Sequence, residues 1–244
     1  MTEEPNDPPN GETSKAIKIL MKIRKYLEDE DLVTMLTEIQ NEAHAEGKKP
    51  DPFRILISTI LSVRNRDEST VIATKKLFDE AGYNTPEKIA GAPVEEIEQL
   101  IRRSGMYRMK TERIKATSKM LIDEHDGEVP RDMKSLLALP GVGRKVANCV
   151  KVYAFKEPAI PVDVHVHRIS NRLGLVKTKK PNQTERKLQN LYPQKYWTVI
   201  NDSLVIFGKT VCKPTSPQCD TCPVSDLCPK LIKKKTKRKT KPKN

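Results

Sequence analysis

The stretch that most constrains this 244-residue chain is LPGVGRKVA, residues 139–147, where two glycines precede a helix. Pro140 ends the preceding helix, and Gly141 and Gly143 allow backbone angles and close approaches that a side chain would obstruct. Val142 can enter the core while the N–H groups and dipole at the start of the next helix face outward, a site suited to a phosphate. A lone Gly-x-Gly turn is as often a plain connection between helices, but the full string is far more specific.

The rest of the chain is patterned for helices. Aromatic residues make up 5% of the sequence and there are only 10 glycines, whereas Leu, Ile, Lys and Glu are plentiful. Asp51 and Pro52 are typical of a helix start, and Asp67 is expected to be the N-cap of the next helix along the chain. No long alternating pattern of the kind that predicts a strand is found. Apolar residues recur at helical spacing, as at Ile17, Leu20, Ile23 and Leu27.

Charge is concentrated at the C-terminus. The formal net charge is +13, and residues 230–244 hold nine basic side chains and no acidic one. We expect this segment to be a disordered basic tail that binds a polyanion, serves nuclear import or only aids solubility. Residues 1–14 are acidic and rich in proline, and are expected to be disordered too. No membrane span is expected, so the prediction is an intracellular protein, in the cytoplasm and nucleoid or in the nucleus of a eukaryote.

Two residues point to chemistry. Lys145 lies in the first turn of the hairpin helix, where the helix dipole disfavours a cation, so stability does not explain it. Asp163 follows an extended segment and precedes a helix. Lys145 can be a phosphate contact and Asp163 an N-cap, but an amine nucleophile beside a carboxylate also suits attack on the anomeric carbon of a deoxyribose. Such attack would expel the base and leave a Schiff base.

The cysteines predict a metal centre. Four of them, spaced C-x6-C-x2-C-x5-C, fall in a short polar stretch: Cys212, Cys219, Cys222 and Cys228. In a reducing compartment they are more readily explained as ligands than as disulfides, and four thiolates suit either a structural zinc ion or a [4Fe-4S] cluster. Cys149 lies apart from them on the hairpin helix and is expected to be a core thiol.

LPGVGRKVA followed by VDVHVHRISNR resembles the endonuclease III family of DNA glycosylases, over roughly residues 17–229. The hairpin string resembles that family's helix-hairpin-helix motif, and Lys145 and Asp163 fall on its catalytic lysine and aspartate. The resemblance implies a bifunctional enzyme that removes a base and then cleaves the strand by β-elimination. It also implies that the four cysteines hold a [4Fe-4S] cluster whose loop presents Lys213, with Lys209 as a further candidate, to DNA phosphates.

Base extrusion needs side chains that fill the gap left in the duplex. The resemblance places these in the turn of residues 62–67, where many relatives have a glutamine and this chain has Arg64 and Asn65, and at Met106, whose other interpretation is packing at a helix start. His165 could approach the lesion, whereas Arg168 and Arg172 are expected to be phosphate contacts or surface charges. The expected DNA-binding residues are Gly141, Val142, Gly143, Arg144, Arg64, Asn65, Met106, His165 and Lys213.

Together these features predict an all-α protein of two lobes. A six-helix domain containing the hairpin spans 48–157, residues 15–47 and 158–229 form the iron-sulfur cluster domain, and the active site lies in the cleft between them. The expected activity is excision of oxidised pyrimidines, of the thymine glycol type, from damaged double-stranded DNA by a monomer that needs no Mg²⁺. Two alternatives are a glycosylase for thymine or uracil opposite guanine on the same scaffold, and a non-catalytic DNA-binding protein.

Overall fold

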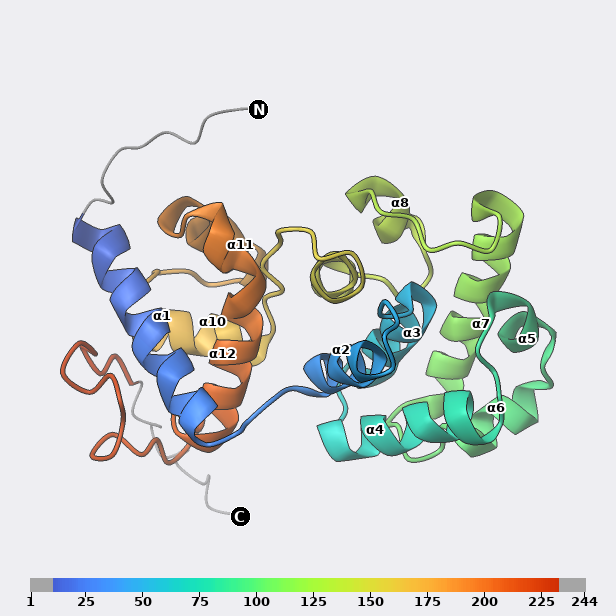
Figure 1. The fold of residues 1–244 in the computed structure, drawn as a ribbon, viewed down its shortest axis with the longest axis horizontal. Helices are drawn as coiled ribbons and strands as arrows, with labels where there is room; N and C mark the ends of the chain where they lie inside the picture. The colour runs from blue at the N-terminus through green and yellow to red at the C-terminus, as the bar shows by residue number, and fades with distance from the viewer. Residues whose placement is uncertain (1–10, 233–244) are drawn as a thin grey trace, which may run out of the picture.

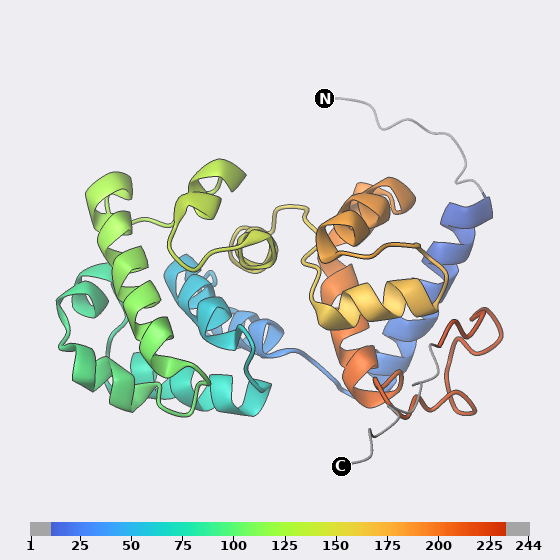
Figure 2. The same ribbon diagram turned by 180° about the vertical axis from the view of Figure 1, so that it is seen from behind.

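The computed structural model describes residues 11–232, and within that range every regular element is a helix. The helices form two lobes that lie side by side (Figure 1), and the view from behind shows the same division (Figure 2). The expected all-α, two-lobed architecture is therefore confirmed. The expected disorder of the two tails falls mostly on residues 1–10 and 233–244, which lie outside the described part of the chain.

The elements follow one another with short connections. In chain order they are α1 (Gly11–Asp29), α2 (Met35–Ala45), α3 (Pro52–Ser62), α4 (Asp67–Lys75), α5 (Pro86–Gly91), α6 (Val94–Leu100), α7 (Tyr107–His125), α8 (Met133–Ala138), α9 (Arg144–Cys149), α10 (Val164–Arg172), α11 (Pro181–Leu191) and α12 (Trp197–Thr210). Turns of π-helix, η1 (Lys76–Glu80) and η2 (Val150–Ala154), continue α4 and α9, and a 3-10 turn, η3 (Gln194–Tyr196), precedes α12. None of the described helices is long and apolar enough to cross a membrane.

The first lobe contains α3 to α9 around one apolar core. Its central helix, α3, starts as expected: the Asp51 side chain accepts a hydrogen bond from the Phe53 amide at 2.9 Å, and Pro52 occupies the first turn. The neighbours of α3 are α4, α7 and α9, while α7 also packs along α5 and α6. The apolar stripe of α3 is buried throughout and consists of Phe53, Leu56, Ile57, Ile60 and Leu61.

The second lobe joins the two ends of the described chain. α1 packs against α11 and α12, and α10 packs against α12, so that helices far apart in sequence share one core. The Tyr192 hydroxyl donates a hydrogen bond to the Ala16 carbonyl oxygen at 3.0 Å, which fixes α11 to α1. α1 begins at Gly11, three residues before the expected end of the tail at residue 14. Its expected stripe is buried at Leu20, Ile23 and Leu27.

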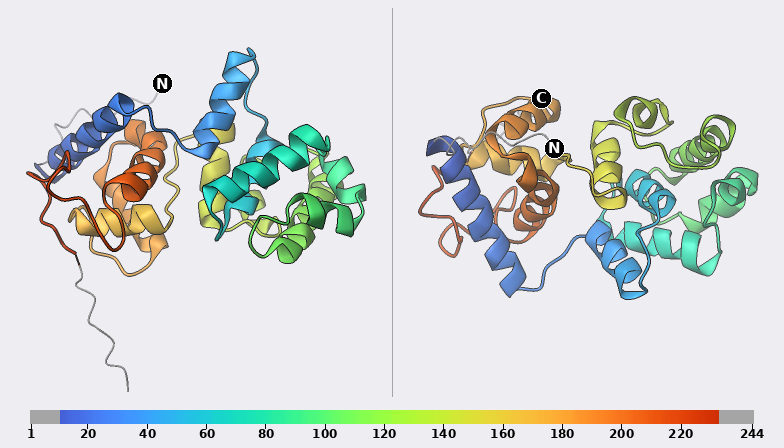
Figure 3. Two further views of the ribbon diagram at one scale, coloured as in Figure 1. Left: turned by 90° about the horizontal axis from the view of Figure 1, so that it is seen from below. Right: turned by 45° about the horizontal axis from the view of Figure 1, so that its top comes forward.

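α2 differs from the expected assignment of residues 15–47 to the cluster domain. The segment after α1 crosses to the other lobe, where Leu36 and Ile39 of α2 pack with Ile55, Val152 and Tyr153 (Figure 3). Thr34 caps α2, its hydroxyl accepting from the Thr37 amide. The reason is burial of apolar surface, because the apolar stripe of α2 packs against α3 and η2. Of the two helices within the expected segment, α1 therefore belongs to the second lobe and α2 to the first.

The cysteine-bearing loop after α12 is held by two arginines of α10. The Arg168 guanidinium donates to the carbonyl oxygens of Gly208 and Cys212 at 3.0 and 3.2 Å, and that of Arg172 donates to the Lys213 and Pro214 carbonyl oxygens at 2.8 and 2.7 Å. A segment without regular helix must satisfy its backbone acceptors in this way. The structure thus gives both arginines backbone partners within the protein, a role that the expectation of phosphate contacts or surface charges did not include.

Candidate active site

A cleft of about 520 Å³ lies between the lobes, and both predicted catalytic residues line it. The first lobe contributes Lys145 and Val146 from α9, and the second lobe contributes Asp163 and His165 from the start of α10. The two glycines of the hairpin and the turn of residues 62–65 also line it. Residues distant in sequence thus face the same solvent-accessible space.

The hairpin has the geometry that its glycines predict. Gly141 has φ +81°, and a Cβ atom there would approach the Arg113 side chain to 3.0 Å, so two separate constraints require glycine. Val142 is buried in the core, and its amide donates to the Leu139 carbonyl oxygen at 3.1 Å. Gly143 precedes α9 with no side-chain cap. The first turn of α9, which contains Lys145, therefore begins at an exposed backbone.

Asp163 caps α10, as its N-cap interpretation predicts. Its Oδ1 atom accepts hydrogen bonds from the amides of His165 and Val166, both at 2.8 Å. Because both bonds end on one oxygen, capping fixes the carboxylate without using both of its acceptors. The cap thereby holds a carboxylate in the cleft that Lys145 also lines.

Cys149 lies one helical turn after Lys145 and is fully buried, which confirms it as a core thiol. Burial raises the pKa of this thiol, the Lys145 ammonium opposes that rise, and the carboxylates of Asp163 and Asp202 add to it. The catalytic candidates are therefore close enough to influence one buried group. For His165, burial lowers the pKa of the imidazole and Asp163 opposes the change.

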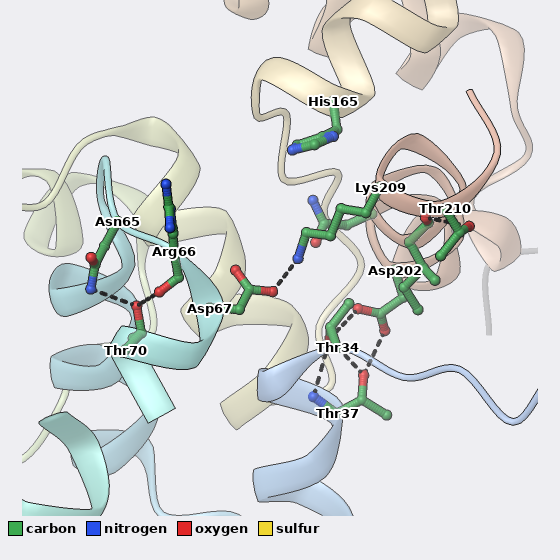
Figure 4. Close-up of polar contacts among 12 residues, drawn as sticks. Thr34, Thr37, Asn65, Arg66, Asp67, Thr70, His165, Asp202, Lys209 and Thr210 are labelled. Carbon is green, nitrogen blue, oxygen red and sulfur yellow. Dashed lines mark hydrogen bonds and ion pairs between the residues drawn. The ribbon is translucent and has the colours of Figure 1, made fainter. Parts of the chain in front are cut away.

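Polar side chains join the lobes across the cleft. Lys209 of α12 forms an ion pair with Asp67, which is the first residue of α4 and makes no cap hydrogen bond, contrary to the expected N-cap (Figure 4). Beside the cleft, which Thr34 lines, Asp202 of α12 accepts hydrogen bonds from the hydroxyls of Thr34 at 2.7 Å and Thr37 at 2.9 Å (Figure 4). The buried Tyr153 hydroxyl also donates to Asp202.

Lys209 was predicted as a phosphate contact and Asp67 as a cap, whereas Asp202 and Tyr153 were not among the predicted site residues. Their sequence signal is a polar residue among apolar ones, as in KVYAF for Tyr153 and INDSLVIF for Asp202. Tyr153 also donates to Asn201, at 3.0 Å, and burial raises its pKa well above the ordinary range, with the Asp202 carboxylate adding to the rise. Polar groups on the buried face of a helix need partners, so such positions indicate contacts between elements.

The predicted wedge residues lie together at two adjacent turns. Arg64 and Met106 both have left-handed backbone conformations, with φ +52° and +58°. Asn65 joins the turns, because its Nδ2 atom donates to Ser104 Oγ at 3.3 Å and its Oδ1 accepts from the Gly105 amide at 3.4 Å. The side chain of Met106 is 39% exposed, which is unusual for a methionine placed only for core packing.

Two other expected DNA contacts have different surroundings. The Arg144 guanidinium forms a two-point ion pair with Glu185 of α11, at 2.9 and 2.6 Å, and the Glu185 side chain is 3% exposed. Arg144 thus links the hairpin to the second lobe, and the carboxylate raises its pKa. Lys213 lies in the cysteine loop, where its carbonyl oxygen accepts from Arg172, and it does not line the cleft.

The four cysteines of the loop share one environment. Burial raises the pKa values of Cys222 and Cys228, and Cys212 and Cys219 add to the rise in both cases. Arg172 donates to Cys212 Sγ at 3.6 Å, and the Lys230 amide donates to Cys228 Sγ at 3.3 Å. Donors aimed at sulfur stabilise thiolates, so the donors to Cys212 and Cys228, in a loop with four thiols, fit an iron-sulfur cluster.

Comparison with known proteins agrees with this site. Residues 57–194 match the family model described as HhH-GPD superfamily base excision DNA repair protein, and residues 212–228 match the iron-sulfur binding domain of endonuclease III. Endonuclease III of Thermotoga maritima is 52% identical over 191 residues, which are 78% of this chain and 89% of that protein. Endonuclease III of Bacillus subtilis is 41% identical over 187 residues, 76% of this chain and 84% of that protein.

Solved structures agree as well. A trapped endonuclease III–DNA covalent intermediate is 38% identical, with a TM-score of 0.76 over 89% of this chain and 96% of that one. A thermostable thymine-DNA glycosylase is 26% identical, with a TM-score of 0.77 over 88% of this chain and 96% of that one. The chain therefore belongs to the endonuclease III family of the HhH-GPD superfamily, and is a base excision repair DNA glycosylase with abasic-site lyase activity and a [4Fe-4S] cluster.

Proposed function

We propose that this enzyme excises oxidised pyrimidines of the thymine glycol type from damaged duplex DNA, with Lys145 as nucleophile and Asp163 as its carboxylate partner. The observation that carries the proposal is that both residues line one cleft from opposite lobes. The enzyme acts as a monomer, because one chain supplies both groups. Its place of action is wherever duplex DNA is held, the nucleoid or, in a eukaryote, the nucleus.

The reaction begins with the neutral amine of Lys145. Its nitrogen forms a bond to C1′ of the deoxyribose while the C1′–N bond to the base breaks, and the electron pair leaves with the base, which takes up a proton. Asp163 accepts the proton lost by the amine and stabilises the cationic sugar. Opening of the sugar ring gives a Schiff base. Loss of a C2′ proton then breaks the C3′–O bond, and the 3′ phosphate leaves with its electron pair.

DNA binding is assigned to the hairpin and to the loops around the cleft. The backbone of Gly141, Val142 and Gly143, at the open start of α9, suits a phosphate. Arg144 is the first residue of α9, Lys213 of the cysteine loop is a further proposed contact, and His165 lies at the cleft. On this proposal residues 48–157 grip the DNA and the lobe of 158–229 completes the active site.

The gap left by the extruded base is filled from the two adjacent turns. Met106 is exposed and apolar, as an intercalating side chain must be, and Arg64 and Asn65 occupy the turn where a glutamine is absent. The residues of this turn bear on which base the enzyme accepts opposite the lesion. The second candidate function is therefore a glycosylase for thymine or uracil opposite guanine, and the likeness to a thymine-DNA glycosylase favours it.

The cluster is assigned a structural role. Cys212, Cys219, Cys222 and Cys228 are its proposed ligands, and when bound it would bridge the loop into one rigid unit. Arg168 and Arg172 of α10 hold the same loop by its carbonyl oxygens. The loop and the helix that starts at Asp163 are thereby fixed to one another.

Borohydride trapping tests the proposal. Purified protein is incubated with duplexes containing thymine glycol, an abasic site or a G:T mismatch, and Lys145→Ala is compared with Lys134→Ala, which removes an exposed lysine of α8 outside the cleft lining. We expect adducts on thymine glycol and abasic DNA that only Lys145→Ala abolishes. An adduct on the mismatch and not on thymine glycol would favour the second candidate. No adduct from the unaltered protein would contradict the Schiff-base mechanism.

A further inference from the structure

Lys110 of α7 is a fully buried lysine with no part in the cleft. It is 1% exposed and shares the buried face of α7 with Ile114 and Leu121. Burial, with the nearby Arg113 guanidinium, lowers the pKa of its amine to about 8. Burying such a group is unfavourable unless hydrogen bonds compensate, so the contacts of its amine indicate what the position serves.

The amine of Lys110 bonds to both turns that carry the proposed wedge residues. Its Nζ atom donates to the Leu61 carbonyl oxygen at 2.6 Å and to Ser104 Oγ at 2.8 Å. Leu61 is three residues before Arg64, and Ser104 is two residues before Met106. One buried side chain therefore joins the last turn of α3 to the turn before α7.

Other polar groups complete this connection. The Ser104 hydroxyl donates to the same Leu61 carbonyl oxygen at 3.1 Å and accepts from Asn65 Nδ2 at 3.3 Å. The backbones also pass closely, because a Cβ atom on Gly105 would lie 3.7 Å from the Arg64 carbonyl oxygen. Asn65 is tied to α4 in addition, through Thr70 Oγ1 at 3.0 Å (Figure 4).

The tips of both turns need such support. Arg64 and Met106 each adopt a left-handed conformation that non-glycine residues seldom hold, and such conformations persist only where the surroundings enforce them. The network of Lys110, Ser104 and Asn65 lies directly behind both tips. We infer that Lys110 is a positioning residue that holds the tips of Arg64 and Met106 at a fixed spacing, so that both enter the duplex together when a base is extruded.

This inference rests on the proposed roles of Arg64 and Met106 as wedges, and it gives Lys110 no contact with DNA. A fixed spacing matters because extrusion of a paired base costs a few kcal/mol, and filling the gap from two rigid points lowers the cost of ordering them at that moment. Loss of the connection should then impair extrusion and leave the chemistry at Lys145 intact.

The test compares Lys110→Met with Lys115→Met. Lys115 is on the same helix and also donates to backbone carbonyl oxygens, those of Ile89, Ala90 and Ala92, but it touches neither turn. Thermal melting establishes that both variants fold. The readouts are single-turnover excision of thymine glycol from a duplex and from the same strand unpaired, and fluorescence of 2-aminopurine beside the lesion, which reports unstacking.

For Lys110→Met we expect duplex excision to fall about tenfold, the scale of ~1.4 kcal/mol in the extrusion step, with the 2-aminopurine signal reduced. Excision from the unpaired strand should change less than about twofold, and Lys115→Met should match the unaltered protein. The inference would be overturned if Lys110→Met slowed excision equally on both DNA forms, if the two variants had equal effects, or if Lys110→Met had no effect. An unaltered protein inactive on thymine glycol would instead refute the proposed substrate, and the 2-aminopurine comparison on abasic DNA would still test Lys110.

Ser104→Ala guards against a Lys110→Met protein that does not fold. It deletes one hydroxyl and leaves the bond from Lys110 to Leu61 in place. We expect a smaller loss in the same direction, on the duplex only. A Ser104→Ala enzyme with full duplex activity and an unchanged 2-aminopurine signal would count against the inference.

Discussion

Asp163 caps α10, and the chemical role proposed for its carboxylate can be separated from the cap. Asn is as good an N-cap as Asp, so Asp163→Asn should keep the bonds to the His165 and Val166 amides and change the free energy of unfolding by less than about 0.5 kcal/mol. Without the carboxylate, the proton of Lys145 has no acceptor beside it. We expect single-turnover base excision to fall by about 10²-fold or more, measured with thermal melting on the same preparation.

Asp163→Ala is the comparison variant, because it removes both functions. Its stability should fall by about 1 kcal/mol, the usual cost of losing a cap. If Asp163→Asn excised the base at the unaltered rate, the carboxylate would be a cap and nothing more, and the proposed proton acceptor would have to be sought elsewhere in the cleft.

At the scale of elements, the hairpin is bound to α11 through Arg144 and Glu185. Because Glu185 is almost fully buried, Arg144→Ala leaves an unpaired carboxylate inside the protein. We expect the free energy of unfolding to fall by about 2 kcal/mol, less than for a fully buried pair because the arginine is half-exposed. Denaturant unfolding measures the loss, and Arg144→Ala/Glu185→Gln should recover part of it.

The same variant distinguishes two roles of Arg144. An arginine that serves mainly as a phosphate contact would lose DNA affinity on substitution, with a shallower salt dependence, and would keep its stability. Unchanged unfolding of Arg144→Ala would therefore contradict the structural role of the pair.

The helices that could be predicted are those whose signals are local. Asp51 with Pro52 marks the start of α3, and the Gly141–Gly143 spacing marks the hairpin, because caps and glycine conformations depend on neighbouring residues. The location of α2 could not be predicted, since its stripe is equally suited to either lobe and only packing decides. The same holds for Asp67, whose acidic side chain at a helix start pairs with Lys209 instead of capping.

At the scale of the whole molecule, the width of the cleft depends on a few polar contacts. Asp202 accepts from Thr34, Thr37 and Tyr153, so Asp202→Ala removes the acceptor common to all three. We expect looser lobes: faster proteolysis between α1 and α2, and single-turnover excision reduced by about tenfold because Lys145 and Asp163 no longer meet at fixed spacing. Limited proteolysis and kinetics on one preparation check both.

Asp226→Ala is the matched control, because Asp226 belongs to the same lobe and forms its ion pair with Lys22 at the surface. It should leave cleavage and kinetics unchanged. Equal proteolysis of Asp202→Ala and the unaltered protein would contradict a role of Asp202 in holding the lobes together.

The sequence also could not reveal which residues of the two lobes come together at the site. Lys145 and Asp163 were predictable from their local motifs, whereas Tyr153, Asp202 and Lys209 acquire meaning only when the lobes meet. Their partners lie on other elements, so no spacing within the chain indicates them. Lys110 carried a weak signal, a charge on the same helical face as Ile114 and Leu121.

The discontinuous lobe has a consequence for how the molecule is made. α1 leaves the ribosome first, but its partners α10, α11 and α12 are synthesised only after the whole of the other lobe. At typical rates of synthesis its apolar stripe waits roughly ten seconds for them. The hairpin lobe can fold in that interval, whereas the cleft cannot exist until the last helix has docked. The active site therefore cannot form before α12 has been synthesised, however early the hairpin lobe folds.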